Sequence, residues 1–277
     1  MDLTDKSQLM GYLKQKGIWA KKGLSQNFLV DRAALDKIVA AAEIEKGDKI
    51  IEVGPGVGTL TTELIEKSDS VTSIELDSTL ATLLSEQLSE RENFNLIEGD
   101  VLDTNIGEIV QSDPYKVVAN IPYAITSKII KLFLTLSNKP TSLVMLVQKE
   151  VAERICAKPG QMSVLAISVQ LYGVPEIVDI VKADSFFPAP KVDSAIIRIR
   201  IDNSEEKVVP PSEKNFFRCV KIGFSSKRKK LANNLMSGYH LDRKNVSDII
   251  NKIGLEEGVR AQDLTISQWN QLSQLIK

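Results

Sequence analysis

Short apolar runs alternate with helix-type patterns through the first two thirds of the chain. Runs rich in Val, Ile and Leu predict strands over residues 49–53, 71–75, 94–98, 116–120 and 142–148. Apolar positions spaced three and four apart predict helices over residues 59–66, 78–89, 127–136, 149–156 and 164–172. Nearly continuous apolar strands that alternate with helices are typical of a parallel sheet covered on both faces.

The pattern changes near residue 205. Residues 176–181 and 194–201 predict a terminal antiparallel pair, after which a polar stretch leads to Pro210 and Pro211. Beyond them, three or four helical segments follow with no convincing strand. We therefore predict an α/β fold: a Rossmann-like, mostly parallel sheet with a terminal antiparallel strand over residues 1–205, and a small all-α domain over residues 206–277.

The composition excludes several classes of protein. The chain has 277 residues and a formal net charge of −1, and its length suffices for a large core without disulfides or metal. No apolar run approaches 18 residues and no secretory signal is recognisable, so we expect a soluble, cytoplasmic protein without a membrane span. Two cysteines (Cys156, Cys219) and a single histidine (His240) offer no metal-ligand spacing, and we expect no metal.

Positive charge is concentrated at the two ends of the sequence. The stretches between Asp5 and Asp31 and between Glu213 and Asp242 contain no acidic residue, yet together they carry twelve Lys and Arg. Solvated helix faces would explain one such run, whereas two favour a surface for a polyanion such as nucleic acid. The candidate RNA-binding residues are Lys21, Lys22, Arg218, Lys221, Lys227, Arg228, Lys229 and Lys230.

Small and acidic residues follow the first three predicted strands. Gly54, Gly56 and Gly58 follow the first, Glu75 ends the second and Asp100 follows the third. Ligands of open α/β sheets bind at this carboxyl edge, where an acid about 20 residues after the glycine turn can hold a ribose. The sequence thus favours a nucleoside ligand. A dehydrogenase is disfavoured because Thr59 replaces the last glycine of the dinucleotide fingerprint and no acid for hydride chemistry is apparent.

The fourth predicted strand ends in Asn120, Ile121, Pro122 and Tyr123. An ordinary turn with Tyr123 packed inward would explain these residues. Alternatively, the Asn120 side-chain oxygen and the Ile121 carbonyl are two acceptors that could hold the amino group of an adenine and favour a tetrahedral, nucleophilic nitrogen. The Tyr123 ring could then stack on the base.

Several motifs together resemble the ribosomal RNA adenine dimethyltransferase family, from about Lys21 to near the C-terminus. They are Ser25-Gln-Asn-Phe-Leu29, Glu52-Val-Gly-Pro-Gly56, Ile74-Glu-Leu-Asp77, Asn120-Ile-Pro-Tyr123, Gln148-Lys-Glu-Val151, Phe186-Phe-Pro-Ala-Pro-Lys-Val-Asp-Ser194 and Arg228-Lys-Lys-Leu-Ala-Asn-Asn-Leu235.

The resemblance implies a class I methyltransferase sheet, S-adenosylmethionine as cofactor and a helical domain that contacts RNA. By resemblance, the cofactor-binding residues are Asn27, Leu29, Gly54, Gly56, Glu75, Leu76, Asp100, Val101 and Asn120. The target adenine would meet Asn120, Ile121, Pro122, Tyr123 and a second stacking ring, Phe186. The implied reaction adds two methyl groups to each of two adjacent adenosines near the 3′ end of 16S rRNA, in the 30S subunit, by a monomer with a role in subunit biogenesis.

Two positions depart from the pattern of the small-subunit branch. Ser25 stands where Gly is expected, as it often does in the branch that methylates 23S rRNA and confers macrolide resistance, and Ala232 replaces an expected arginine. A 23S rRNA enzyme and a catalytically silent RNA-binding assembly factor therefore remain alternatives. The motifs around Gln148 and Ser194 and the long helical C-terminal region favour the small-subunit branch.

Overall fold

The computed structural model describes residues 1–24, 26–202, 204 and 207–276. They form two compact units, one of residues 1–152 with 174–201, the other of residues 153–173 with 202–277. The predicted boundary between residues 205 and 206 lies outside the described residues. The division differs from the predicted one over residues 153–173, which group with the C-terminal helices although they precede two strands of the sheet.

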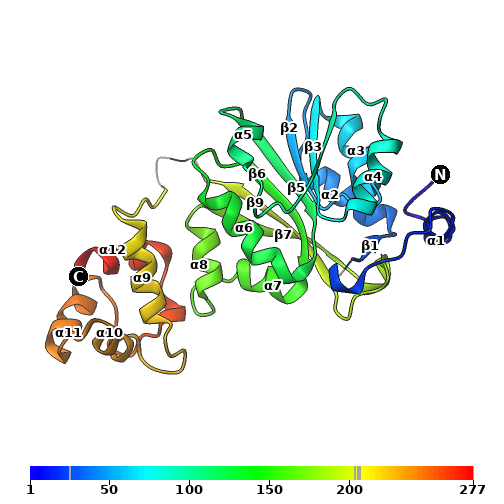
Figure 1. Ribbon diagram of the computed structural model, residues 1–277. Coiled ribbons are helices and arrows are strands. Elements are labelled where there is room, and N and C mark those ends of the chain that lie inside the picture. Colours follow the sequence, from blue (N-terminus) through cyan, green and yellow to red (C-terminus); the bar gives the residue numbers. More distant parts are fainter. Residues whose placement is uncertain (25, 203, 205–206, 277) are drawn as a thin grey trace. The chain divides into compact units, whose positions relative to one another are not determined.

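Strands and helices alternate through the N-terminal unit (Figure 1). The strands are β1 (Phe28–Leu29), β2 (Lys49–Val53), β3 (Ser70–Glu75), β4 (Phe94–Glu98), β5 (Tyr115–Asn120), β6 (Ser142–Gln148), β7 (Gly173–Val181), β8 (Phe186–Phe187) and β9 (Ser194–Ile201). The helices are α1 (Lys6–Gln15), α2 (Arg32–Ala41), α3 (Thr59–Lys67), α4 (Ser78–Gln87), α5 (Ile106–Val110) and α6 (Thr126–Thr135), while α7 (Lys149–Ile155) leads out of this unit.

Among the described residues, seven strands form the main sheet in the order β4-β3-β2-β5-β6-β9-β7. The first five are parallel to their neighbours, and β9 is antiparallel to β6. Helices α2 and α3 lie on one face of the sheet and α5 and α6 on the other (Figure 1). The predicted α/β class and its terminal antiparallel strand are confirmed, with three strands starting one to three residues earlier than predicted.

The central strands are buried on both faces, as the sequence pattern indicates. Every residue from Leu143 to Val147 in β6 is buried, and so are Val117, Val118 and Ala119 in β5. Because both faces are covered by helices, these strands carry no alternation of polar and apolar residues. Side-chain caps fix the starts of the flanking helices: Asp31 accepts from Ala34 N–H and Asp77 from Thr79 N–H.

The N-terminal segment contains structure that the sequence reading did not predict. Helix α1 starts at the cap residue Asp5 and buries Leu9, Tyr12 and Leu13. These residues belong to an apolar cluster that includes Phe28, Val57, Leu80 and Leu83. Further along, β1 pairs antiparallel with β8, which ties the segment before α2 to the loop before β9. The spacing of Leu9, Tyr12 and Leu13 after an Asp was the available signal for α1.

The C-terminal unit is all helical within its described residues. Its helices are α8 (Val164–Gln170), α9 (Glu213–Gly223), α10 (Leu231–Tyr239), α11 (Arg243–Lys252) and α12 (Ile266–Leu275). Its core holds Phe216, Leu235 and Trp269, and the Trp269 ring stacks on Phe224 with centroids 5.7 Å apart. In the described part of the chain, no helix has the length and apolar character needed to cross a membrane.

We predict that Leu9→Ala lowers the free energy of unfolding by about 2–5 kcal/mol, because it empties a fully buried position in the α1 cluster. Met10→Ala is the control, since this neighbouring side chain is exposed and its loss should change stability by about 0.5 kcal/mol or less. Urea unfolding measures both variants. Equal free energies of unfolding for the Leu9→Ala and Met10→Ala variants would show that α1 does not pack on the rest of the N-terminal unit.

Candidate active site

Three strand ends are joined at the carboxyl edge of the sheet by backbone hydrogen bonds. Gly54 N–H, just past β2, donates to the Ile74 carbonyl at 3.0 Å, and Gly99 N–H, just past β4, donates to the Glu75 carbonyl at 2.8 Å. The loops after β2, β3 and β4 therefore start from fixed positions around one crevice. Open α/β sheets bind their ligands at such an edge.

The turn after β2 depends on glycine at two positions. Gly54 has φ of +70°, and a Cβ there would lie 3.5 Å from the Asn120 carbonyl oxygen. Gly58, the residue before α3, has φ of +88°, and a Cβ there would meet Leu84 Cδ2 at 2.8 Å. The left-handed backbone favours glycine at both positions, and at Gly58 a larger residue would also displace the Leu84 side chain. The turn can thus bring backbone against a ligand, and it sets β2 directly beside the end of β5.

Glu75 is the central polar group of this edge. One carboxylate oxygen accepts the Gly56 N–H at 3.0 Å and the other accepts the Asp77 N–H at 2.8 Å. Burial raises the pKa of Glu75, while these two N–H groups act to lower it. The carboxylate joins the glycine turn to the end of β3 and still lines the crevice. Each oxygen keeps a lone pair for a further donor such as a ribose hydroxyl.

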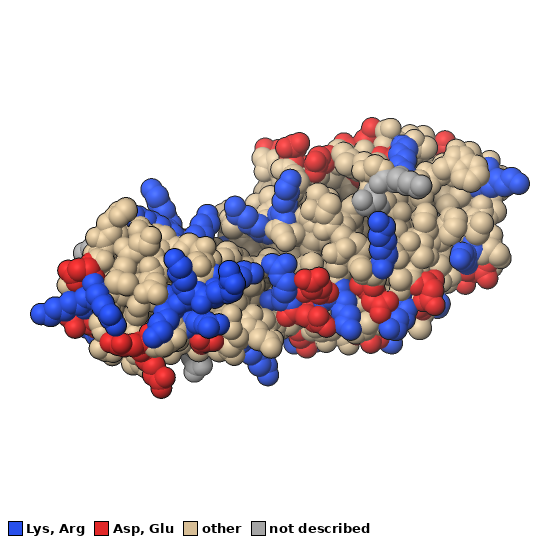
Figure 2. Space-filling view, turned by 90° about the horizontal axis from the view of Figure 1, so that it is seen from below, with Lys and Arg blue, Asp and Glu red and all other residues tan. Residues whose placement is uncertain are grey.

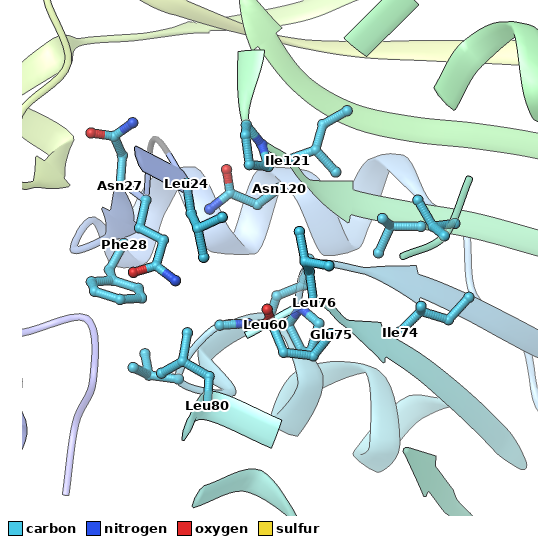
Figure 3. A pocket seen from close by; sticks show the side chains of 18 of the residues that line it. Leu24, Asn27, Phe28, Leu60, Ile74, Glu75, Leu76, Leu80, Asn120 and Ile121 are labelled. Carbon is cyan, nitrogen blue, oxygen red and sulfur yellow. Dashed lines mark hydrogen bonds between the residues drawn. The ribbon is translucent and has the colours of Figure 1, made fainter. Parts of the chain in front are cut away.

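A pocket opens between these loops. The space between the loops, counted together with the part that is open to solvent, is about 1100 Å³. Figure 3 shows the side chains of Leu24, Leu76 and Asn120 directed into the same space. Leu76 is 54% exposed although it directly follows a buried strand. An exposed leucine beside a carboxylate suits a ligand with an apolar ring and polar hydroxyls.

All the predicted cofactor-binding residues line this pocket. They are Asn27, Leu29, Gly54, Gly56, Glu75, Leu76, Asp100, Val101 and Asn120. The predicted target-site residues Ile121, Pro122 and Tyr123 line it as well. Residues that are up to 96 positions apart in the sequence therefore meet in one place. Their roles toward a ligand remain predictions.

Asn120 is the last residue of β5, and Pro122 leads into a short 3-10 turn over Tyr123–Ile125. Tyr123 is half-buried, not packed into the interior, and its hydroxyl lies 2.5 Å from the Ser194 hydroxyl. Burial raises the pKa of the Tyr123 phenol, and the bond to Ser194 acts in the opposite direction. The ring is held at the pocket wall by an anchored hydroxyl.

Phe186 does not lie in the pocket. It pairs with Leu29 across the small sheet and is 1% exposed within the main core cluster. Successive strand residues point to opposite sides, so pairing of β8 with β1 turns Phe186 inward and leaves Phe187 half-buried. The structure therefore removes Phe186 from the predicted stacking site, because its ring is occupied in the core.

The N-terminal segment is attached to the pocket through Asp77. Lys21 Nζ lies 2.7 Å from one oxygen of this buried carboxylate, and the Gln26 side chain donates to the other at 2.9 Å. Burial acts to raise the pKa of Asp77, but the bonds from Lys21, Gln26 and Thr79 N–H together lower it. Lys21, predicted to bind RNA, thus forms an ion pair with the buried carboxylate of Asp77 while its own side chain stays half exposed. The side chain of Lys22 and the departure at Ser25 lie outside the described part.

The other predicted RNA-binding residues lie on the C-terminal unit. Arg218, Lys221, Lys227, Arg228, Lys229 and Lys230 are all exposed, and Figure 2 shows Lys and Arg gathered on one face of this unit. Residues 227–230 do not lie on a helix, because they form the connection between α9 and α10, which we call the basic loop. The buried Asn234 amide shapes this basic loop by donating to the carbonyls of Gly223 and Ser226. Arg218 lies over the Tyr239 ring, 5.0 Å from its centroid.

Comparison with known proteins identifies the chain. The sequence profile of ribosomal RNA adenine dimethylases matches residues 18–277. The chain belongs to the ribosomal RNA adenine dimethylase family. As a family member it is an enzyme, an rRNA adenine dimethyltransferase, and the family implies S-adenosylmethionine as the methyl donor.

Relatives of this adenine dimethylase cover almost its whole length. The ribosomal RNA small subunit methyltransferase A of Dehalococcoides mccartyi (strain ATCC BAA-2266 / KCTC 15142 / 195) is 41% identical over 254 residues, which is 91% of this chain and 87% of the relative. The enzyme of that name from Clostridium botulinum (strain Okra / Type B1) is 42% identical over 259 residues, 92% and 93% of the two chains.

Two solved structures share the fold of this adenine dimethylase. The 23S rRNA methyltransferase ErmE matches with a TM-score of 0.74 at 30% identity, over 90% of this chain and 99% of that one. A dimethyladenosine transferase from Plasmodium falciparum also matches at 0.74, with 27% identity, over 88% and 95% of the two chains. The predicted methyltransferase fold and family are confirmed.

Several pocket residues of this adenine dimethylase were missed from sequence. Phe28, Val57 and Leu80 line the pocket and also belong to the α1 cluster. Gln26 stands inside a recognised motif, so the motif itself was a signal for it. Nothing local in the sequence indicated the bond from Lys21 to Asp77, because the two residues are 56 positions apart.

Glu52, in β2 beneath the glycine turn, is a fully buried carboxyl. One of its oxygens lies 2.5 Å from the Ser73 hydroxyl, and the other has no hydrogen-bond partner among the described residues. Burial raises the pKa of Glu52 to about 7, against an ordinary value of 4.5. The folded protein therefore keeps the Glu52 proton at pH values where the unfolded chain releases it.

We predict that the stabilising contribution of protonated Glu52, about 3 kcal/mol from this shift, is complete below pH 4.5 and is lost as the pH rises to 7. The free energy of unfolding of Glu52→Gln, measured relative to that of the parent, should therefore rise by roughly 2–3 kcal/mol from pH 5 to pH 8. Urea unfolding at several pH values measures this difference, with Glu98→Gln, an exposed carboxyl, as control. A constant difference would contradict the raised pKa.

Proposed function

We propose that this enzyme uses S-adenosylmethionine to dimethylate N6 of two adjacent adenosines near the 3′ end of 16S rRNA, in a 30S particle late in its assembly. The observation that carries the proposal is the meeting of Asn120 and Tyr123 with Glu75 and the glycine turn in one pocket. Small-subunit methyltransferases at 41–42% identity support the choice of rRNA. This substrate implies action in the cytoplasm.

The pocket fits the cofactor by three independent features. The Glu75 carboxylate offers acceptors to ribose hydroxyls, the exposed Leu76 side chain offers an apolar surface to adenine, and Asp100 lies at the next strand end to receive the adenine amine. The glycine turn admits backbone contact near Asn120. When bound, the cofactor supplies a methyl group carried on a sulfonium.

Asn120, Ile121 and Tyr123 would hold the target adenine. The Asn120 side-chain oxygen and the Ile121 carbonyl accept its N–H groups, which favours the tetrahedral nitrogen that attacks a methyl carbon. A base inside RNA must leave its stack first, and stacking on Tyr123 offsets part of that cost. Since alignment and exclusion of water supply most of the acceleration, no strong base is required.

The C-terminal unit would bind the phosphate groups of the RNA backbone. The cations of the basic loop are exposed, and Lys and Arg bind phosphate without regard to sequence. Selection of the base and attachment to the RNA are thereby assigned to different residues. A monomer suffices for this arrangement.

The decisive experiment offers labelled S-adenosylmethionine to unmethylated 30S and to 50S subunits in parallel. Label recovered as dimethyladenosine from the 30S subunit supports the proposal, and mapping by primer extension tests the two adjacent positions. Label in the 50S subunit would instead assign the 23S activity of the structural relative ErmE. Binding to 30S without transfer of label would identify a silent assembly factor.

We predict that Asn120→Ala lowers the methyl transfer rate on the order of a hundredfold or more, because it removes an acceptor for the attacking nitrogen. Its affinity for S-adenosylmethionine should stay within about tenfold. Glu75→Ala is the complementary variant and should mainly weaken the cofactor, as measured by calorimetry. An Asn120→Ala enzyme with full activity would contradict the assigned role.

We predict that replacing Lys227, Arg228, Lys229 and Lys230 by Gln weakens binding to 30S subunits. The slope of log Kd against log salt concentration should fall by up to about four, because each lost phosphate contact lowers it by about one. Filter binding at several salt concentrations measures the slope. The control replaces Lys46, Lys49 and Lys67 of the N-terminal unit. Loss of binding to one RNA sequence alone, with an unchanged slope, would argue against phosphate contact.

A further inference from the structure

The hydroxyl of Tyr123 is bound to a residue that the family assignment leaves without a role. Tyr123 Oη and Ser194 Oγ are 2.5 Å apart, and Ser194 is 0% exposed. Either oxygen can be the donor. A short bond between two hydroxyls, one of them fully enclosed, fixes the far end of the Tyr123 ring.

Ser194 is itself held firmly. It is the first residue of β9, where it pairs with Gln148 at the end of β6, and the preceding Asp193 carbonyl accepts the Lys149 N–H at 3.0 Å. Strand β6 lies between β5 and β9. The bond therefore runs from the loop after β5, past the end of β6, to a backbone position clamped on two sides.

The side chain of Tyr123 is less enclosed than that of Ser194. Tyr123 starts a 3-10 turn that leads directly into α6, and its side chain is half-buried at the pocket wall. Proline fixes the backbone before it, but the ring can still rotate about its side-chain bonds. Anchoring the hydroxyl removes that freedom, so the ring plane is set before any base arrives.

We propose that Ser194 is a positioning residue for methyl transfer: it fixes the plane of the Tyr123 ring on which the target adenine stacks. This inference rests on the proposed function, because it takes the adenine to be the base that Tyr123 meets. Losing the bond would leave the pocket and the cofactor residues intact while the adenine becomes less well aligned. Misalignment of this kind lowers the rate of the chemical step more than it lowers binding.

The test is a double-mutant cycle of Ser194→Ala, Tyr123→Phe and both together. Each single change removes the same hydrogen bond from a different side. We expect each to lower kcat for 30S methylation roughly five- to fiftyfold with S-adenosylmethionine affinity unchanged within about twofold. The double variant should be no slower than the slower single one, because the bond can be lost only once.

A spectroscopic readout separates positioning from mere structural support. In 30S particles assembled with 8-vinyladenine in place of the target adenine, a fluorescent base that keeps the N6 amino group, stacking on Tyr123 quenches the fluorescence of the probe. Both single variants should restore part of that fluorescence. Ser68→Ala is the matched control, since Ser68 is also buried but its hydroxyl donates to the Leu64 carbonyl within the α3 region.

The outcomes are distinct. Additive effects in the cycle, or Ser194→Ala equal to Ser68→Ala in both readouts, would overturn the inference alone. A parent enzyme that neither methylates 30S subunits nor quenches the probe would overturn the proposed function. If Ser194→Ala does not fold, Tyr123→Phe still tests the bond, because it removes only an oxygen at a half-buried position.

Discussion

The Glu75 carboxylate is the interaction on which the pocket depends. Its two oxygens accept N–H groups from the glycine turn and from the start of the α4 cap, and its own carbonyl accepts Gly99 N–H. One residue thereby joins the loops after β2, β3 and β4. Without the carboxylate, the turn at Gly56 would lose the only side-chain acceptor described for it.

A second group of contacts fixes the N-terminal segment, residues 21–24 and 26–29, beside the pocket. Asp77 gathers Lys21 and Gln26, and β1 pairs with β8, so the segment before α2 is attached to the pocket at both ends. The residues proposed to hold the base thus belong to a frame of paired strands and ion pairs within the N-terminal unit. The exposed cations belong to the helical unit, where an uncharged buried amide, Asn234, sets the shape of their loop.

Much of this arrangement could be predicted from the sequence, for physical reasons. Strand β6 was predicted to the residue because a strand covered on both faces is apolar almost throughout. Gly54, Glu75 and Asp100 were predicted because a glycine turn and strand-end acids act locally, at positions fixed by the sheet, whereas Asn27 and Leu29 were predicted from the family resemblance alone. Motif spacing carries that information.

What was not predictable depends on contacts distant in sequence. The choice between Phe186 and Phe187 is made by pairing with Leu29, and the engagement of Lys21 is made by a buried acid 56 positions away. The shape of the basic loop depends on Asn234, whose side chain donates to the carbonyls of Gly223 at the end of α9 and of Ser226 in the loop. Local patterns contain none of these partners.

Helix α1 gives the pocket a second layer. Phe28, Val57 and Leu80 line the cavity and share an apolar cluster with Leu9, Tyr12 and Leu13, whereas the family profile begins only at residue 18. A compound that reached behind those three side chains would touch a part of the protein outside the shared profile. The cavity lining therefore depends, through its packing on α1, on residues that the family profile does not cover.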